Sequence, residues 1–195
     1  NTNSWDRGFF LYLPKNSIQT ILIKNIIDQG NEKNFSNSRN FIHIDKNANC
    51  KIIYTEESSL SSCINNASEI YIDNNAKLEL IKITNKIKGS KQIYNCAVAL
   101  NRNAELIYHA IDTSGKMIKN NYHINLNKPG SSCYFNGFNT ADNKDHLDNY
   151  IEIHHNSKNT SSHLDYKIIS NKTAKSILYA KAIIKKNSCN SEAHQ

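Results

Sequence analysis

Arginine is nearly absent from this sequence of 195 residues, which contains 3 Arg against 21 Lys. The formal net charge is +7, a value that on its own suggests a nucleic-acid-binding surface. Arginine, however, is the side chain best suited to bidentate contacts with phosphate and guanine, and the lysines are spread along the chain without a dense block. Lysine also accompanies 31 Asn and 27 Ile, and these three residue types share A/T-rich codons. We therefore expect solvated lysines on strand faces and no nucleic-acid partner.

Paired cysteine motifs are missing as well. The cysteines are scattered along the chain, and even the nearest two, Cys50 and Cys63, are too far apart for a C-x-x-C zinc or redox motif. An odd and scattered set is typical of reduced thiols in a cytosol-like compartment, not of a disulfide framework. We expect small buried thiols at all five positions: Cys50, Cys63, Cys96, Cys133 and Cys189.

Membrane spans and the common catalytic templates are also lacking. No apolar run approaches the roughly 18 residues of a membrane span, and no signal peptide opens the chain. The first residue is Asn, which suggests a fragment or a processed product. The sequence has no Gly-rich phosphate loop, no G-x-S-x-G and no clear acid–base pair of carboxylates. We expect turns at Pro129-Gly130 and Asn136-Gly137, and we assign no catalytic, cofactor-binding or metal-ligating residue.

A regular internal repeat is the clearest positive feature. Asn47-Ala48, Asn75-Ala76 and Asn103-Ala104 recur at a constant interval, since 75 − 47 and 103 − 75 both equal 28. The count continues to Ser131-Ser132, Asn159-Thr160 and Asn187-Ser188. Each station is a small or polar pair of the kind found in turns, because Asn tolerates the left-handed backbone conformation. Self-similarity at this period indicates a repeat architecture.

Period-two alternation flanks these stations, with Ile42 and Ile44 before the first and Ile70 and Ile72 before the second. The pattern predicts two half-buried strands per repeat, and the β-branched segment 16–27 also fits a strand. A second, looser turn is expected at 56–68, 85–91 and 112–120. A parallel β-helix and a meander of hairpins both satisfy the period. We favour the β-helix because a stack of turns needs the same small residue on each rung.

The histidine-rich segment 142–167 is the best candidate for a metal site. His146 and His154 share one face of a predicted strand with Asp148 and Glu152, and His155 points to the opposite face. Residues that lie along one strand are too far apart to share an ion, since His146 and His154 would be separated by about 26 Å. His163 follows the Asn159-Thr160 turn and is expected to return against this strand. We favour a surface strip of histidines over a metal site.

The C-terminal third resembles a known family. It contains Lys119-Asn120-Asn121, Asn136-Gly137, Asp142 with Lys144-Asp145-His146, His154 or His155, and Ser162 to Tyr166-Lys167. The closing segment keeps Ser191, Ala193 and Gln195, whereas a Gly-x-x-x-Gly segment is replaced by Ser176–Ala180. This pattern resembles the core domain of the SufB/SufD scaffold proteins of SUF iron–sulfur cluster assembly, and Asp165-Tyr166-Lys167 favours the SufD branch.

The resemblance implies an all-β fold, a right-handed parallel β-helix with about 28 residues and two strands in each repeat. It implies that residues 1–195 form the β-helix core domain, without the family's N-terminal region and C-terminal helical domain. It also implies a non-enzymatic scaffold in the bacterial cytosol or plastid stroma, which pairs with a SufB-like subunit through the β-helix ends and works with a SufC-like ATPase. A cluster would form transiently in the assembled complex, and none would be held by this chain. The alternative is a secreted-type β-helix enzyme that acts on polysaccharide, although no repeating alignment of acidic residues supports a substrate groove.

Overall fold

The structure of the protein is a computed structural model that describes residues 7–27, 35–58, 62–85, 89–186 and 188–195. All elements found in these residues are β-strands: β1 Phe10–Leu13, β2 Ile18–Ile27, β3 Phe35–Ile44, β4 Asn49–Ser58, β5 Cys63–Ile72, β6 Lys77–Asn85, β7 Lys91–Leu100, β8 Glu105–Ser114, β9 Met117–Leu126, β10 Ser132–Ala141, β11 His146–His155, β12 Ser161–Ser170, β13 Lys175–Ile184 and β14 Glu192–His194. No helix long and apolar enough to cross a membrane occurs among them.

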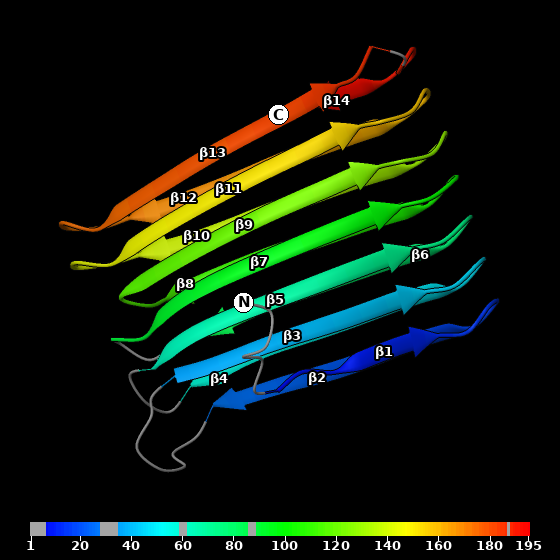
Figure 1. Cartoon of the computed structure of the whole chain (residues 1–195). Coiled ribbons are helices and arrows are strands. Elements are labelled where there is room, and N and C mark those ends of the chain that lie inside the picture. The colour runs from blue at the N-terminus through cyan, green and yellow to red at the C-terminus, as the bar shows by residue number, and fades with distance from the viewer. Residues whose placement is uncertain (1–6, 28–34, 59–61, 86–88, 187) are drawn as a thin grey trace.

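The strands form two parallel sheets that face each other. The odd-numbered strands make one sheet in the order β1-β3-β5-β7-β9-β11-β13, and the even-numbered strands make the other, from β2 to β14. The chain alternates between the sheets and climbs one rung for every two strands (Figure 1). The sequence offset between partners on neighbouring rungs varies from 26 (Leu100 and Leu126) to 31 (Leu13 and Ile44). The predicted β-helix with two strands per repeat is therefore confirmed, and the hairpin meander is wrong.

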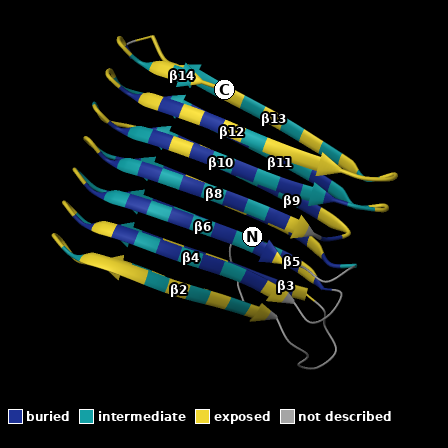
Figure 2. Ribbon diagram, turned by 180° about the vertical axis from the view of Figure 1, so that it is seen from behind, coloured by how far each residue is buried: buried dark blue, intermediate teal, exposed yellow. Residues whose placement is uncertain are grey.

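In most strands the side chains alternate between the interior and the outer faces. In β11 the odd positions from Leu147 to His155 are buried, and the even positions are partly exposed. This alternation follows from the strand geometry, and it encloses a narrow core between the two sheets. The middle rungs are the most buried, whereas β2 and β12 to β14 at the two ends expose more of their surface (Figure 2).

One edge of the solenoid is a stack of turns built on asparagine. Six asparagines there adopt positive φ angles between 53° and 62°, and Gly130 takes the equivalent place on the fifth rung with φ 76°. On the lower rungs each side-chain amide donates to the asparagine of the rung below, as in Asn75 Nδ2 to Asn47 Oδ1 (3.2 Å). On three rungs the residue after the turn asparagine is a buried alanine that points into the core, namely Ala48, Ala76 and Ala104. The six asparagines are Asn16, Asn47, Asn75, Asn103, Asn159 and Asn190.

Four of the six predicted stations lie in this stack, and two are corrected. The interval from Asn103 to the turn residue of the next rung is one residue shorter than the predicted 28. The turn therefore falls at Gly130-Ser131 instead of Ser131-Ser132. The last station is Asn190-Ser191, because Asn159 is linked to Asn190 by its side chain and to Cys189 by its backbone. The expected residue, Asn187, lies outside the described residues.

The opposite edge carries the second set of turns, which are shorter than predicted. Only Gly115 and Lys116 connect β8 to β9, so most of segment 112–120 is strand. Glu56–Ser58 and Cys63–Ser68 also belong to strands, and residues 59–61 and 86–88 lie outside the described residues.

Asn136-Gly137 is not a turn, contrary to the prediction, whereas Pro129-Gly130 is one. Gly137 lies in the middle of β10, where an added Cβ atom would overlap the Tyr166 ring. Glycine is needed there for the close approach of an aromatic ring, not for a left-handed backbone.

Candidate functional site

The half of the interior next to the second set of turns is polar. Inward positions near the C-terminal ends of the even-numbered strands form a column of in-register residues, Glu56, Thr84, Asp112 and Asn139. The first half of the odd-numbered strands supplies the facing column, Asn66, Tyr94, Asn120 and Asn149. All eight are buried, with exposed fractions of 2% or less. A continuous run of hydrogen-bonding groups therefore follows the solenoid axis inside the core.

A buried positive charge lies beside this column. It is that of Lys82, which occupies the inward position before Thr84 on β6. Its Nζ atom lies 3.7 Å from Glu56 Oε2 and 3.6 Å from Asp112 Oδ1, and the three side chains are at most 1% exposed. Lys82 Nζ also donates to Thr84 Oγ1 (2.6 Å) and lies 4.5 Å from the centre of the Tyr94 ring. Burial of a charge is costly unless it is paired and hydrogen-bonded, and this lysine is both.

Amides donate hydrogen bonds to both carboxylates, while Asp112 Oδ1 has the ion pair with Lys82 and no hydrogen bond among the described residues. Glu56 accepts from Asn66 Nδ2 and from Gln92 Nε2, each at 2.8 Å. Asp112 accepts from Asn120 Nδ2 at 2.8 Å, and the same amide also donates to Asn149 at 2.8 Å. These contacts extend from Glu56 on β4 to Asn149 on β11, so buried polar groups are connected across five successive rungs.

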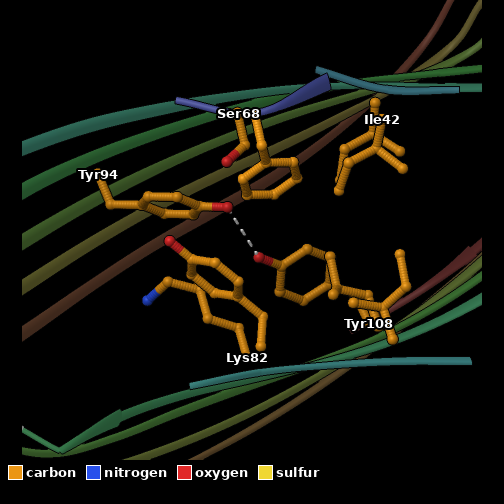
Figure 3. Close-up of a pocket in the computed structure, with 10 residues that line it drawn as sticks. Ile42, Ser68, Lys82, Tyr94 and Tyr108 are labelled. Atoms are coloured by element: carbon orange, nitrogen blue, oxygen red, sulfur yellow. Dashed lines mark hydrogen bonds between the residues drawn. The ribbon is translucent and has the colours of Figure 1, made fainter. Parts of the chain in front are cut away.

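A small cavity borders this cluster on its apolar side. Its volume of about 10 Å³ is at the lower limit for holding one water molecule, and its lining includes Ile42, Ser68, Lys82, Tyr94 and Tyr108 (Figure 3). The hydroxyls of Tyr94 and Tyr108 meet across it at 3.3 Å. The cavity therefore marks the boundary between the polar and apolar halves of the core.

Burial keeps the neighbouring hydroxyl and thiol groups protonated. Desolvation raises the pKa of Tyr94, Tyr108 and Tyr122 well above the ordinary value. It also raises the pKa of the Cys96 thiol to about 11. At neutral pH these groups are therefore uncharged, and none of the four is poised to act as a nucleophile or general base.

The cysteines divide into two kinds. Cys50, Cys96 and Cys133 are buried as predicted, whereas Cys63 and Cys189 are exposed, and all five are free. Desolvation raises the pKa of Cys50 to about 11 and also raises that of Cys133. The prediction of a buried thiol is wrong for Cys63 and Cys189, because each is in an outward-facing strand position or in a turn.

The histidine-rich segment is distributed over both sheets and both faces. His146 and His154 face outward on β11, and His154 Nε2 lies 3.3 Å from Glu152 Oε2, with His123 Nδ1 of β9 at 3.4 Å from the same oxygen. His163 does not return against β11. It lies on β12 in the other sheet, with its ring centre 6.4 Å from that of His194.

His155 is the buried member of the segment. One ring nitrogen, Nδ1, lies 2.8 Å from Thr160 Oγ1, and the other, Nε2, lies 2.9 Å from Ser162 Oγ. Burial lowers the pKa of His155, so the neutral ring is favoured inside the core. Its role is to bridge β11 to the turn and strand that follow it.

The Lys82 cluster was missed by the sequence analysis, although the alternation contained a sign of it. Leu78, Leu80, Lys82 and Thr84 occupy the same face of β6, so the strand period places the lysine inside. The repeat also aligns Glu56, Thr84 and Asp112, since 84 − 56 and 112 − 84 both equal 28. Charges on a strand are usually solvated, and the general expectation of solvated lysines on strand faces does not hold for Lys82.

These features define the class of protein as a parallel β-solenoid of two sheets. Its interior contains buried charges and hydrogen bonds that connect neighbouring rungs. The chain belongs to the SUF-system iron–sulfur cluster assembly family, because the family model of the SufBD core domain matches residues 25–195. A search of curated proteins gave no match. The family gives a role in iron–sulfur cluster assembly and lends no support to the polysaccharide-acting alternative.

Proposed function

We propose that this protein is a scaffold subunit of an iron–sulfur cluster assembly complex, which pairs with a SufB-like subunit and works with a SufC-like ATPase. The single observation that carries the proposal is the match of the SufBD core domain to residues 25–195. The Asp165-Tyr166-Lys167 segment further favours the SufD branch of the family. The protein would act by positioning its partners, without chemistry of its own, in a bacterial cytosol or plastid stroma.

The form of the solenoid supports a docking role. Apart from the short strands at the two ends, neighbouring strands are joined over nearly their whole length in ladders of parallel hydrogen bonds. At the upper rung, β13 pairs only with β11 among the described strands, and Leu178 and Ala180 on its inner face are partly exposed. Stacking of a second β-helix on such a rung would continue both sheets, which fits pairing through the β-helix ends.

Co-purification tests the proposal. The protein is co-expressed with SufB-like and SufC-like partners from the same source, and affinity capture of the SufB-like subunit is expected to retain it together with the ATPase. Failure to associate with either partner would contradict the proposed function.

A matched pair of variants locates the contact. Leu178→Arg places a charge on the inner face of the upper rung and is expected to abolish capture. Leu22→Arg, at an exposed position of β2 at the opposite end, is the control and should leave capture unchanged. The melting temperature of each variant alone shows whether the fold is intact, and retention of Leu178→Arg with a normal melting temperature would exclude this end as the contact.

A further inference from the structure

A separate group of potential metal ligands lies on the outer face of the lower rungs. His43 belongs to β3, Asp45 follows the same strand, and Asp73 follows β5 on the next rung. One ligand atom from each of the three side chains lies within 4.8 Å of the other two. The three residues are partly buried, and they are far along the chain from the histidine-rich segment.

The imidazole of His43 is held in place but is not fully satisfied. Its ring packs edge-on between Tyr12 (5.3 Å between ring centres) and Tyr71 (5.1 Å) in the aromatic column of neighbouring rungs. The Nε2 atom of His43 is buried and has no hydrogen-bond partner in the described structure. A buried polar atom without a partner is costly, and a bound ion is one way to satisfy it.

The two carboxylates are oriented by groups outside the cluster. The Tyr12 hydroxyl donates to Asp45 Oδ2 (2.6 Å), and the backbone N–H of Lys46 donates to Asp45 Oδ1 (2.7 Å). Asn101 Nδ2 donates to Asp73 Oδ1 (3.1 Å), as does the backbone N–H of Asn74 (2.7 Å). Hydrogen bonds of this type orient the ligands of metal sites from the second coordination shell.

We propose that His43, Asp45 and Asp73 form a binding site for a divalent transition-metal ion such as Zn²⁺ or Co²⁺. One imidazole and two carboxylates suit this class of ion, and solvent would complete the coordination. Ligand atoms at about 2.1 Å from a shared ion lie no more than roughly 4.2 Å apart, so small side-chain rotations close the set. The ion would link two successive rungs at the start of the solenoid.

The test measures Co²⁺ binding to the tag-free protein by titration calorimetry and visible absorption. All variants carry Cys63→Ser and Cys189→Ser, because these exposed thiols are competing ligands. The protein with intact His43, Asp45 and Asp73 is expected to bind one Co²⁺ per chain. His43→Gln and Asp73→Asn should each weaken binding at least tenfold, and saturating Co²⁺ should raise the melting temperature only where the three ligands are intact.

His154→Gln is the matched control, since it removes a different partly exposed histidine beside a carboxylate, Glu152. It should bind Co²⁺ with unchanged affinity. Melting temperatures without metal show that each variant is folded, and Asp73→Asn, which keeps the shape of the side chain, serves if His43→Gln does not fold. Absence of binding to the parent, or unchanged affinity in a folded Asp73→Asn variant, would overturn the proposal.

Discussion

The two halves of the solenoid interior are built by different rules. Next to the asparagine turns most inward positions are apolar, as with Ile44, Ile72 and Leu100, which are fully buried. Next to the second set of turns the same strands enclose Lys82, two carboxylates and a row of amides. The apolar half gains its stability from non-directional burial, whereas the polar half depends on each group keeping its partner. One repeat therefore combines an apolar half, which tolerates substitution, with a polar half whose paired groups hold neighbouring rungs in register.

The largest expected effect comes from removal of the buried cation. Lys82→Met keeps most of the aliphatic stem but leaves the Glu56 and Asp112 carboxylates buried without the positive charge between them. Removal of one partner from a buried ionic cluster typically costs about 3–5 kcal/mol. We expect a loss of this size in the free energy of unfolding, measured by urea denaturation.

Lys51→Met is the matched control for this change. Lys51 pairs with Glu79 at 2.9 Å on the outer surface, where both side chains are partly exposed, so its loss should have little effect. A triple variant, Lys82→Met with Glu56→Gln and Asp112→Asn, removes all three charges and should recover part of the stability. If Lys82→Met were as mild as Lys51→Met, the polar half would not depend on paired charges.

The regular part of this architecture could be predicted from the sequence. The constant spacing of the Asn-Ala pairs indicated the parallel stacking, because a turn that needs a left-handed residue leaves the same residue on each rung. Strand alternation also indicated the outward direction of His146 and His154 and the opposite direction of His155. The predicted stations at Ser131-Ser132 and Asn187-Ser188 are displaced because the offset between partner residues changes to 27 between β8 and β10 and to 31 between β12 and β14.

The polar site could be predicted only in part. Glu56, Lys82 and Asp112 are distant from one another in the chain, and only the register of neighbouring rungs brings them together. Asn136-Gly137 shows the reverse error, in which a strong local turn pair is overridden by strand pairing and by the Tyr166 ring. The expectation that His163 returns against the preceding strand also conflicts with the predicted β-helix itself, because two strands per repeat place consecutive strands in opposite sheets.

An intermediate effect is expected at the asparagine turns, which close the apolar half. Asn75 has φ 57°, and its side chain is hydrogen-bonded to the asparagines above and below it. Asn75→Ala places a Cβ in the left-handed region without the local hydrogen bonds, and we expect a loss of about 1–2 kcal/mol in unfolding free energy. Asn75→Gly keeps the backbone conformation and should lose less, as the natural Gly130 on a higher rung suggests. Equal losses in the two variants would show that the side-chain ladder, not the backbone, determines the turn.

The smallest expected effect is a change in pH dependence at His155, a polar residue enclosed in the apolar half. Burial lowers its pKa in the folded protein, whereas the unfolded chain has the ordinary value of about 6.5. As the pH falls through that value, the unfolded state binds a proton that the folded state does not. His155 therefore lowers stability progressively from about pH 7 downward and has no such effect at higher pH.

His155→Gln should flatten the decline in urea midpoint between about pH 7.5 and 5.5, while its amide can still bond to Thr160 and Ser162. Only one proton is involved, so the slope can differ by no more than about 1.4 kcal/mol per pH unit. His163→Gln, on the exposed face of β12, is the control for loss of a histidine and should keep the parent slope. A parent slope in His155→Gln would mean that the interior accepts the imidazolium, and the apolar half would then be as tolerant of charge as the half that contains Lys82.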